Sequence, residues 1–152
     1  MKVFINFKFL TGAEISDEEK ENVWVKILEL LYPAIDKFCG EDRSRANFIG
    51  MAICEAVYNS FLHGGAAELL EVKIGIFSQK KLIFLIRDNG IFYDKKEIKG
   101  AIKNRDLKKL KNFKPHEKSC GFGFETIFES KPVIKIINKT LFLIWEKPAI
   151  KV

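Results

Sequence analysis

The chain has 152 residues, of which 47% are hydrophobic, and it carries a net charge of +6. This length fits one domain whose core needs neither disulfides nor a structural metal. No low-complexity tract, linker or repeat interrupts the sequence, and no apolar run approaches the roughly 18 residues that cross a bilayer. These features exclude fibrous, disordered and membrane-spanning proteins and predict one soluble globular domain over residues 1–152.

The positive charge is concentrated in one segment. Residues 95–118 contain ten Lys or Arg against three Asp or Glu, so the rest of the chain is close to neutral. A basic segment can bind nucleic acid, an acidic protein or the phosphates of a nucleotide. A solvated loop whose lysines only keep the chain soluble is the alternative.

The N-terminus predicts a strand. Val3, Ile5, Phe7 and Phe9 alternate with mostly polar neighbours, which is a strand pattern and not the apolar core of a signal peptide.

The three cysteines are odd in number and lack metal-like spacing. We therefore expect a cytoplasmic protein.

Two helices are predicted next. Ser16 and Glu19 form a capping box ahead of apolar residues at helical spacing. Pro33 is expected to kink or end this first helix. The second helix is expected to start near Asp42 and to end at the glycine pair 64–65.

The C-terminal half predicts two hairpins separated by the basic segment. Alternating apolar runs predict the strands, and Pro132 is expected to end a short helix between the hairpins. The predicted elements are a hairpin of residues 70–77 and 81–87, a weakly helical stretch over 97–110, a loop over 112–118, a helix over 124–128, and a hairpin of 133–137 and 141–145.

This order of elements predicts the fold class. Strands gathered in hairpins and two consecutive helices indicate an α+β two-layer sandwich, with one antiparallel-rich sheet and helices on a single face. A Rossmann fold is disfavoured, because its strands alternate with crossover helices and a glycine motif follows its first strand.

Three polar residues stand out within the second predicted helix. Glu55, Asn59 and His63 recur every four residues in an otherwise apolar segment, so they form one strip on a helix. Asn59 offers a neutral oxygen suited to Mg²⁺, Glu55 can orient or deprotonate a nucleophile, and His63 can hydrogen-bond at the helix end. A polar edge facing solvent is the alternative.

Two glycine-containing motifs could complete a nucleotide site. Asp88 and Gly90 end a predicted strand, where a carboxylate can accept a hydrogen bond from an exocyclic amine such as that of adenine. An ordinary turn is the alternative. The segment from Lys118 through Ser119, Gly121, Phe122 and Gly123 precedes a helix, whose amides and positive end can hold phosphate oxygens.

Together these motifs resemble the ATPase domain shared by histidine kinases, gyrase, the Hsp90 chaperone and MutL, the Bergerat fold. Within that superfamily the chain is most similar to the anti-sigma-factor serine/threonine kinases, because residues 55–64 read Glu-Ala-Val-x-Asn-x-x-x-His-Gly. The resemblance implies a mixed, mostly antiparallel sheet with helices on one face and an ATP lid over about residues 94–120.

The resemblance also implies roles for individual residues. Glu55 would be the catalytic base, Asn59 the magnesium ligand and Asp88 the adenine reader. The remaining nucleotide contacts would come from His63, Gly90, Lys118, Ser119, Gly121, Phe122, Gly123, Phe124 and Thr140. The implied ligands are ATP or ADP with Mg²⁺, and the implied partners are a sigma factor, a STAS-type antagonist protein or a second copy of the chain.

Several functions remain open at this stage. Phe92 stands where the family has the second glycine of its first glycine box, Lys139 replaces a glycine, and Lys118 with Ser119 replace an arginine. The leading hypothesis is an ATP-dependent serine/threonine kinase that regulates transcription by partner switching. A non-enzymatic, nucleotide-dependent switch is the second, and a basic nucleic-acid-binding domain is the third and less favoured.

Overall fold

The computed structural model describes residues 2–10, 16–63, 69–88 and 123–148. These residues form one five-stranded sheet with strand order β1-β2-β3-β5-β4, and three helices. The elements are β1 (Lys2–Leu10), α1 (Asp17–Cys39), α2 (Arg43–His63), β2 (Leu69–Phe77), β3 (Lys81–Asp88), α4 (Gly123–Glu129), β4 (Val133–Ile137) and β5 (Thr140–Glu146). The α+β class is confirmed.

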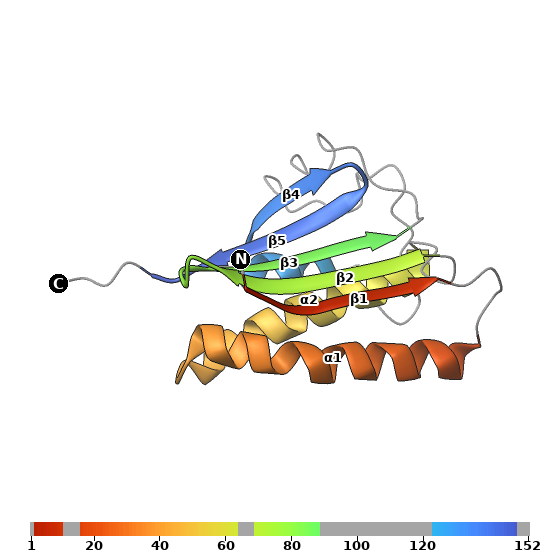
Figure 1. Ribbon diagram of the computed structural model, residues 1–152, viewed down its shortest axis with the longest axis horizontal. Coiled ribbons are helices and arrows are strands. Elements are labelled where there is room, and N and C mark those ends of the chain that lie inside the picture. Colours follow the sequence, from red (N-terminus) through yellow and green to blue (C-terminus); the bar gives the residue numbers. More distant parts are fainter. Residues whose placement is uncertain (1, 11–15, 64–68, 89–122, 149–152) are drawn as a thin grey trace.

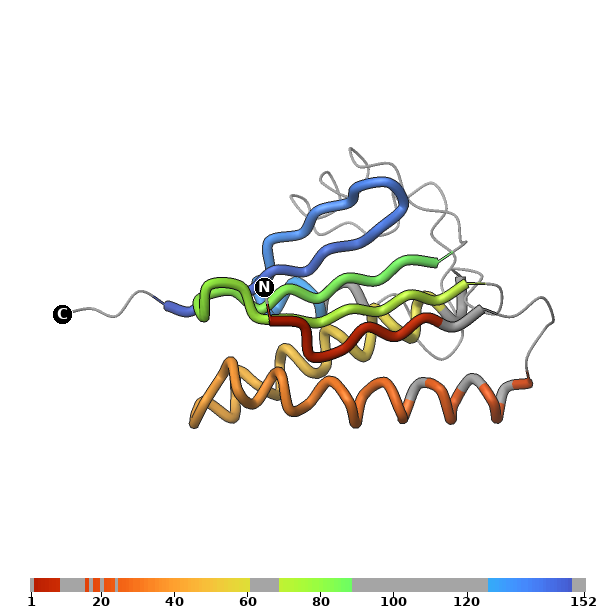
Figure 2. Tube along the Cα trace, in the orientation of Figure 1, coloured from red at the N-terminus to blue at the C-terminus, as the bar shows by residue number. Residues whose placement is uncertain are grey.

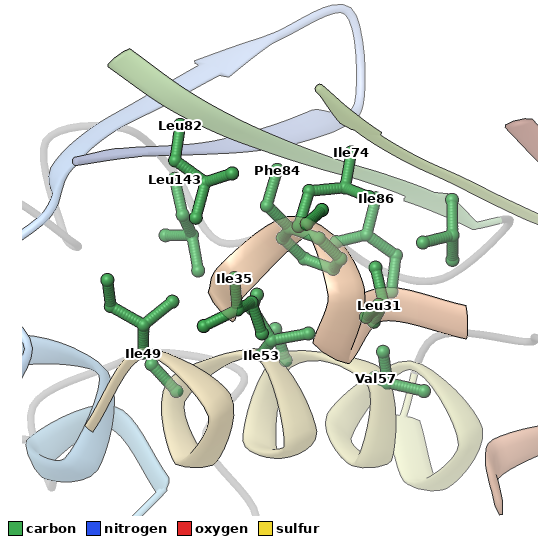
Figure 3. Close-up of a cluster of buried hydrophobic side chains, with 14 of the residues drawn as sticks. Leu31, Ile35, Ile49, Ile53, Val57, Ile74, Leu82, Phe84, Ile86 and Leu143 are labelled. Atoms are coloured by element: carbon green, nitrogen blue, oxygen red, sulfur yellow. The ribbon is translucent and has the colours of Figure 1, made fainter. Parts of the chain in front are cut away.

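The helices lie on one face of the sheet, with α1 and α2 side by side (Figure 1). The core fills the space between the two layers, where β3 and β5 contribute Leu82, Phe84 and Leu143 and α2 contributes Ile49 and Ile53 (Figure 3). All five of these side chains are 0% exposed. At about 25 cal/mol for each Å² of apolar surface removed from water, this layer contact is the main source of stability.

Every strand pairing in the described part of the chain is antiparallel, so the expected mixed sheet is wrong. The reason lies in the helix pair between β1 and β2. Two helices of similar length carry the chain along the sheet and back, so β2 starts at the end where β1 finishes. The two hairpins then reverse the chain again, one turn at each end of the sheet (Figure 2).

The second hairpin has a two-residue turn. Ile137 pairs with Thr140, and both Asn138 and Lys139 adopt left-handed backbone angles, with φ of 49° and 60°. Positive φ at both central positions is the geometry of a type I′ turn, which matches the twist of a hairpin. Asn tolerates this conformation better than most residues do, so the sequence supports the turn locally.

The start of α1 agrees with the sequence. The Ser16 hydroxyl accepts a hydrogen bond from the Glu19 backbone N–H at 3.2 Å, and the Glu19 carboxylate accepts one from the Ser16 N–H at 3.0 Å. The predicted capping box is therefore confirmed.

Of the kink or end expected at Pro33, the end is wrong, because the helix continues to Cys39. A proline removes the hydrogen bond to the carbonyl four residues earlier, here that of Glu29. Glu29 and Pro33 are both exposed, so water can reach this carbonyl. Leu31, Ala34 and Ile35 are at most 1% exposed, and their packing favours continuation of the helix.

Two hydrogen bonds through the Ser130 hydroxyl attach α4 to the sheet. The indole N–H of Trp145 donates to the Ser130 hydroxyl at 3.1 Å, and that hydroxyl donates to the Ile127 carbonyl at 2.7 Å. Trp145 is 1% exposed, so its N–H needs this partner. The pair fixes the end of α4 beneath β5. Within the described ranges, no helix is long and apolar enough to cross a membrane.

Close packing of α1 on α2 yields a stability prediction at Gly50. A Cβ added there would lie 3.5 Å from the Tyr32 ring, an ordinary van der Waals distance. Because glycine in a helix interior costs about 1 kcal/mol relative to alanine, Gly50→Ala is expected to raise the free energy of unfolding by about 0.5–1 kcal/mol in urea titrations. Gly50→Leu, whose longer side chain meets the same ring, is expected to lower it. A less stable alanine variant would contradict this packing.

Candidate functional site

Glu55 and Asn59 lie on the flank of α2 that faces α4. The strip begins at Phe48, which lines a groove together with Ser130 at the end of α4. Ala52, Glu55 and Asn59 continue this strip at spacings of four, three and four residues. Glu55 and Asn59 are half-buried, so these two side chains are neither fully buried in the core nor freely solvated.

Partial burial changes the acid–base chemistry of this flank. Loss of hydration raises the pKa of the Glu55 carboxyl above its ordinary value. Burial likewise raises the pKa of the neighbouring Cys54 thiol, and the negative charge of Glu55 raises it further. Cys54 therefore stays a neutral thiol, while Glu55 is a stronger base than an exposed carboxylate.

Asp88 extends the inward-facing row of β3. Leu82, Phe84 and Ile86 alternate with outward residues and are buried against the helices, and Asp88 follows at the same period. It is 6% exposed and pairs with Leu70 of β2. The carboxylate thus enters the helix layer at the end of a central strand.

Asn59 and Asp88 lie at the same end of the domain. Helix α2 ends at His63, and only residues 64–68 separate it from β2, whose Leu70 pairs with Asp88. Five residues span at most about 18 Å. Figure 1 shows the end of α2 and the end of β3 at the same side of the molecule. The structure therefore brings a carboxylate and an amide to one layer and one end, and Glu55 lies one helical turn farther from that end.

Thr140 is not part of this arrangement. It pairs with Arg87, and its neighbours Leu141, Leu143 and Trp145 face the core, so Thr140 points to the opposite face of the sheet from Asp88. Its hydroxyl donates to the Asn138 carbonyl at 3.4 Å. The hydroxyl supports the hairpin turn.

The other predicted contacts are placed only in part. His63 ends α2 and Gly123 and Phe124 begin α4, with their side-chain surroundings outside the description. The predicted lid over 94–120 lies outside the described residues, as do five predicted contacts: Gly90, Lys118, Ser119, Gly121 and Phe122.

A metal ion at this site would need further oxygen atoms from a bound molecule such as a nucleotide. Among the described residues, no group of three or more His, Cys, Asp or Glu side chains is placed to hold a metal. Asn59 supplies a single neutral oxygen. Mg²⁺ usually keeps several waters and takes its other oxygens from phosphates, so this residue fits a magnesium ion that arrives with a nucleotide.

A groove at the opposite end of the sheet was not predicted. It has a volume of about 620 Å³ and lies between the start of α2, the end of α4 and the end of β5. The Arg45 guanidinium closes one side, donating to the Glu146 carbonyl and lying 5.1 Å from the Phe38 ring centre. Arg45 and Glu146 are 101 residues apart, so no local pattern could reveal the contact. Its lining mixes acidic, basic and apolar groups without a recognisable ligand chemistry.

Comparison with known proteins does not add to this geometry: no protein-family model, no curated protein and no solved structure matches the chain significantly.

The raised pKa of Glu55 predicts a pH-dependent stability effect. Folding disfavours its ionised form, so this group destabilises the fold once the pH rises through its unfolded and folded pKa values. Glu55→Gln is therefore expected to increase the free energy of unfolding more at about pH 7 than at about pH 4, where the carboxyl is largely protonated in both states. Urea unfolding at the two pH values measures the difference.

Glu129→Gln is the matched control, since Glu129 is exposed. A Glu55→Gln effect that is equal at both pH values, or larger at the lower one, would show that burial does not disfavour the charged form.

Proposed function

We propose that the chain binds ATP or ADP between α2 and the end of β3, in a fold of the Bergerat type. The observation that carries this proposal is the inward-facing Asp88 at the same end and in the same layer as Asn59. The order of the described elements and the placement of the helices on one face support it. So does the position of Gly123 at the start of α4, because a helix start suits phosphate oxygens.

Each residue of the site would have a separate task. The Asp88 carboxylate would accept a hydrogen bond from the exocyclic amine of adenine, deep in the helix layer where water competes weakly. Asn59 would hold Mg²⁺ through its amide oxygen. The metal would neutralise phosphate charge, and Glu55, one turn earlier, would face the same phosphates.

We further propose that the activity is phosphoryl transfer to a serine or threonine of a partner protein. Glu55 would take the proton of the attacking hydroxyl, a new oxygen–phosphorus bond would form at the γ-phosphate, and ADP would leave. The raised pKa of Glu55 favours this role, because a base works best when its pKa approaches the working pH. By resemblance, the partner would be a sigma factor or its antagonist.

A non-enzymatic switch is the second candidate. Phe92 replaces a glycine of the family's first glycine box. A bulky ring there favours a protein that binds nucleotide and changes its affinity for a partner without transferring phosphate. The two candidates share the binding site and differ only in chemistry.

Calorimetric titration with ATP and ADP, with and without Mg²⁺, tests the binding site. Asp88→Asn replaces one of the two acceptor oxygens of the carboxylate by an NH2 donor. This change is expected to weaken the binding of both nucleotides by about tenfold or more. Asn59→Ala is expected to weaken binding only when Mg²⁺ is present. Asn47→Ala, at an exposed position of α2, is the control that should bind normally.

Each variant is first checked for a wild-type unfolding transition. Absence of nucleotide binding by the wild type would contradict the proposal. Salt-dependent binding of DNA or RNA that survives Asp88→Asn and Asn59→Ala would favour the basic nucleic-acid-binding alternative.

Transfer of labelled γ-phosphate to candidate partner proteins separates the kinase from the switch. We expect transfer by the wild type and by Glu129→Gln, and a loss of about a hundredfold or more with Glu55→Gln at unchanged nucleotide affinity. Nucleotide binding without transfer to any partner that the chain binds would leave the switch as the function.

A further inference from the structure

The outer face of the sheet carries apolar side chains along three neighbouring strands. In β3 and β5, Leu82, Phe84 and Leu143 point into the core (Figure 3), so the residues between them point away from the helices. An antiparallel sheet with one solvated face normally has polar residues at such positions. Strands that are apolar on both faces are typical of sheets that are covered on both sides.

The strand register arranges these outward residues in a regular array. The rows across β3, β5 and β4 are Ile83, Ile144 and Val133; Leu85, Phe142 and Lys135; and Arg87, Thr140 and Ile137. We call these nine residues the outer patch. Six of them are apolar, two are cationic and none is acidic.

Part of the outer patch is exposed to solvent, and the patch lies on β3, β5 and β4. Val133 is 50% and Ile137 is 51% exposed, while the four central apolar residues are half-buried. None of the three helices in the described ranges lies over this face (Figure 1). The middle outward positions of β1 and β2 are polar, with Asn6, Lys8, Glu71 and Lys73. Val3 and Phe77, farther along the same face, are each 46% exposed. The outer patch is therefore separated from these two apolar side chains by a polar stretch of the sheet.

The charge of the outer patch is positive and uncompensated. Within the described residues, neither Arg87 nor Lys135 forms an ion pair. The neighbouring lysines differ, because Lys73 lies 3.2 Å from Glu71 and Lys81 lies 2.8 Å from Glu146. Each of these flanking pairs is neutral, so the two free cations set the sign of the surface.

We propose that the outer patch is the docking surface for an amphipathic helix of a partner protein, one whose apolar stripe is bordered by Asp or Glu. A helix laid on a sheet is the standard way to cover an apolar sheet face. The acidic borders would meet Arg87 and Lys135 while the stripe covers Leu85 and Phe142. A second copy of this chain fits poorly, because two such faces would bring like charges together. The site lies across the sheet from Asp88, so it does not depend on the nucleotide proposal.

Two synthetic helical peptides of about 18 residues test the docking surface. Both carry one leucine stripe, bordered by Glu in one peptide and by Lys in the other. We expect the Glu peptide to bind the full chain in a fluorescence-polarisation titration and the Lys peptide to bind about tenfold more weakly or not at all. Lys135→Glu should weaken binding of the Glu peptide by about tenfold, and Leu85→Thr should weaken binding of both peptides.

The matched controls are Lys26→Glu and Leu30→Thr, which make the same changes on the exposed side of α1 and should leave binding unchanged. Unfolding curves confirm that each variant is folded. Binding of neither peptide, equal binding of both, or equal effects of the control variants would overturn the proposal. So would sedimentation of the wild type as a dimer that Leu85→Thr converts to a monomer, because a second copy would then cover the patch.

Discussion

The inward-facing row of β3 is the constraint on which the arrangement depends. Phe84 and Ile86 are at most 2% exposed beneath the sheet, and this burial fixes which face of β3 meets α2. A slip of one residue in the register would turn every side chain of the strand to the opposite face. Because Asp88 continues the same alternation, the packing that stabilises the core also directs this carboxylate into the helix layer.

The same constraint gives the two faces of the sheet different chemistry. On the helix side, α2 brings half-buried Asn59 to the end where Asp88 lies, with Glu55 one turn earlier. On the outer side, the residues between the buried positions form an apolar surface that contains Arg87 and Lys135. Among the described elements, β3 belongs to both the proposed ligand site and the proposed partner surface, so this strand could couple them.

Local features of the fold could be predicted from the sequence, whereas contacts between distant residues could not. The Ser16 and Glu19 cap and the Asn138 turn depend on residues within a few positions of one another. The hydrogen bonds from Trp145 to Ser130 and from Arg45 to Glu146 join separate elements. α1 does not end at Pro33, because burial of the neighbouring side chains outweighs one lost hydrogen bond. The sequence places Asn59 and Glu55 on one strip of a helix. Thr140 points to the sheet face opposite Asp88, because the strand register decides which face a side chain occupies. The near-continuous apolar runs of β3 and β5 were an available signal for the outer patch.

The proposed nucleotide site lies between α2 and the end of β3. Backbone amide chemical shifts during titration of the isotope-labelled chain with Mg-ATP test it most directly, because they locate the ligand without a substitution. We expect the largest changes among the described residues at 55–59 and 86–88, with little change in the groove formed by 42–45 and 129–133. Changes concentrated in that groove at the opposite end, or no changes at saturating nucleotide, would contradict it.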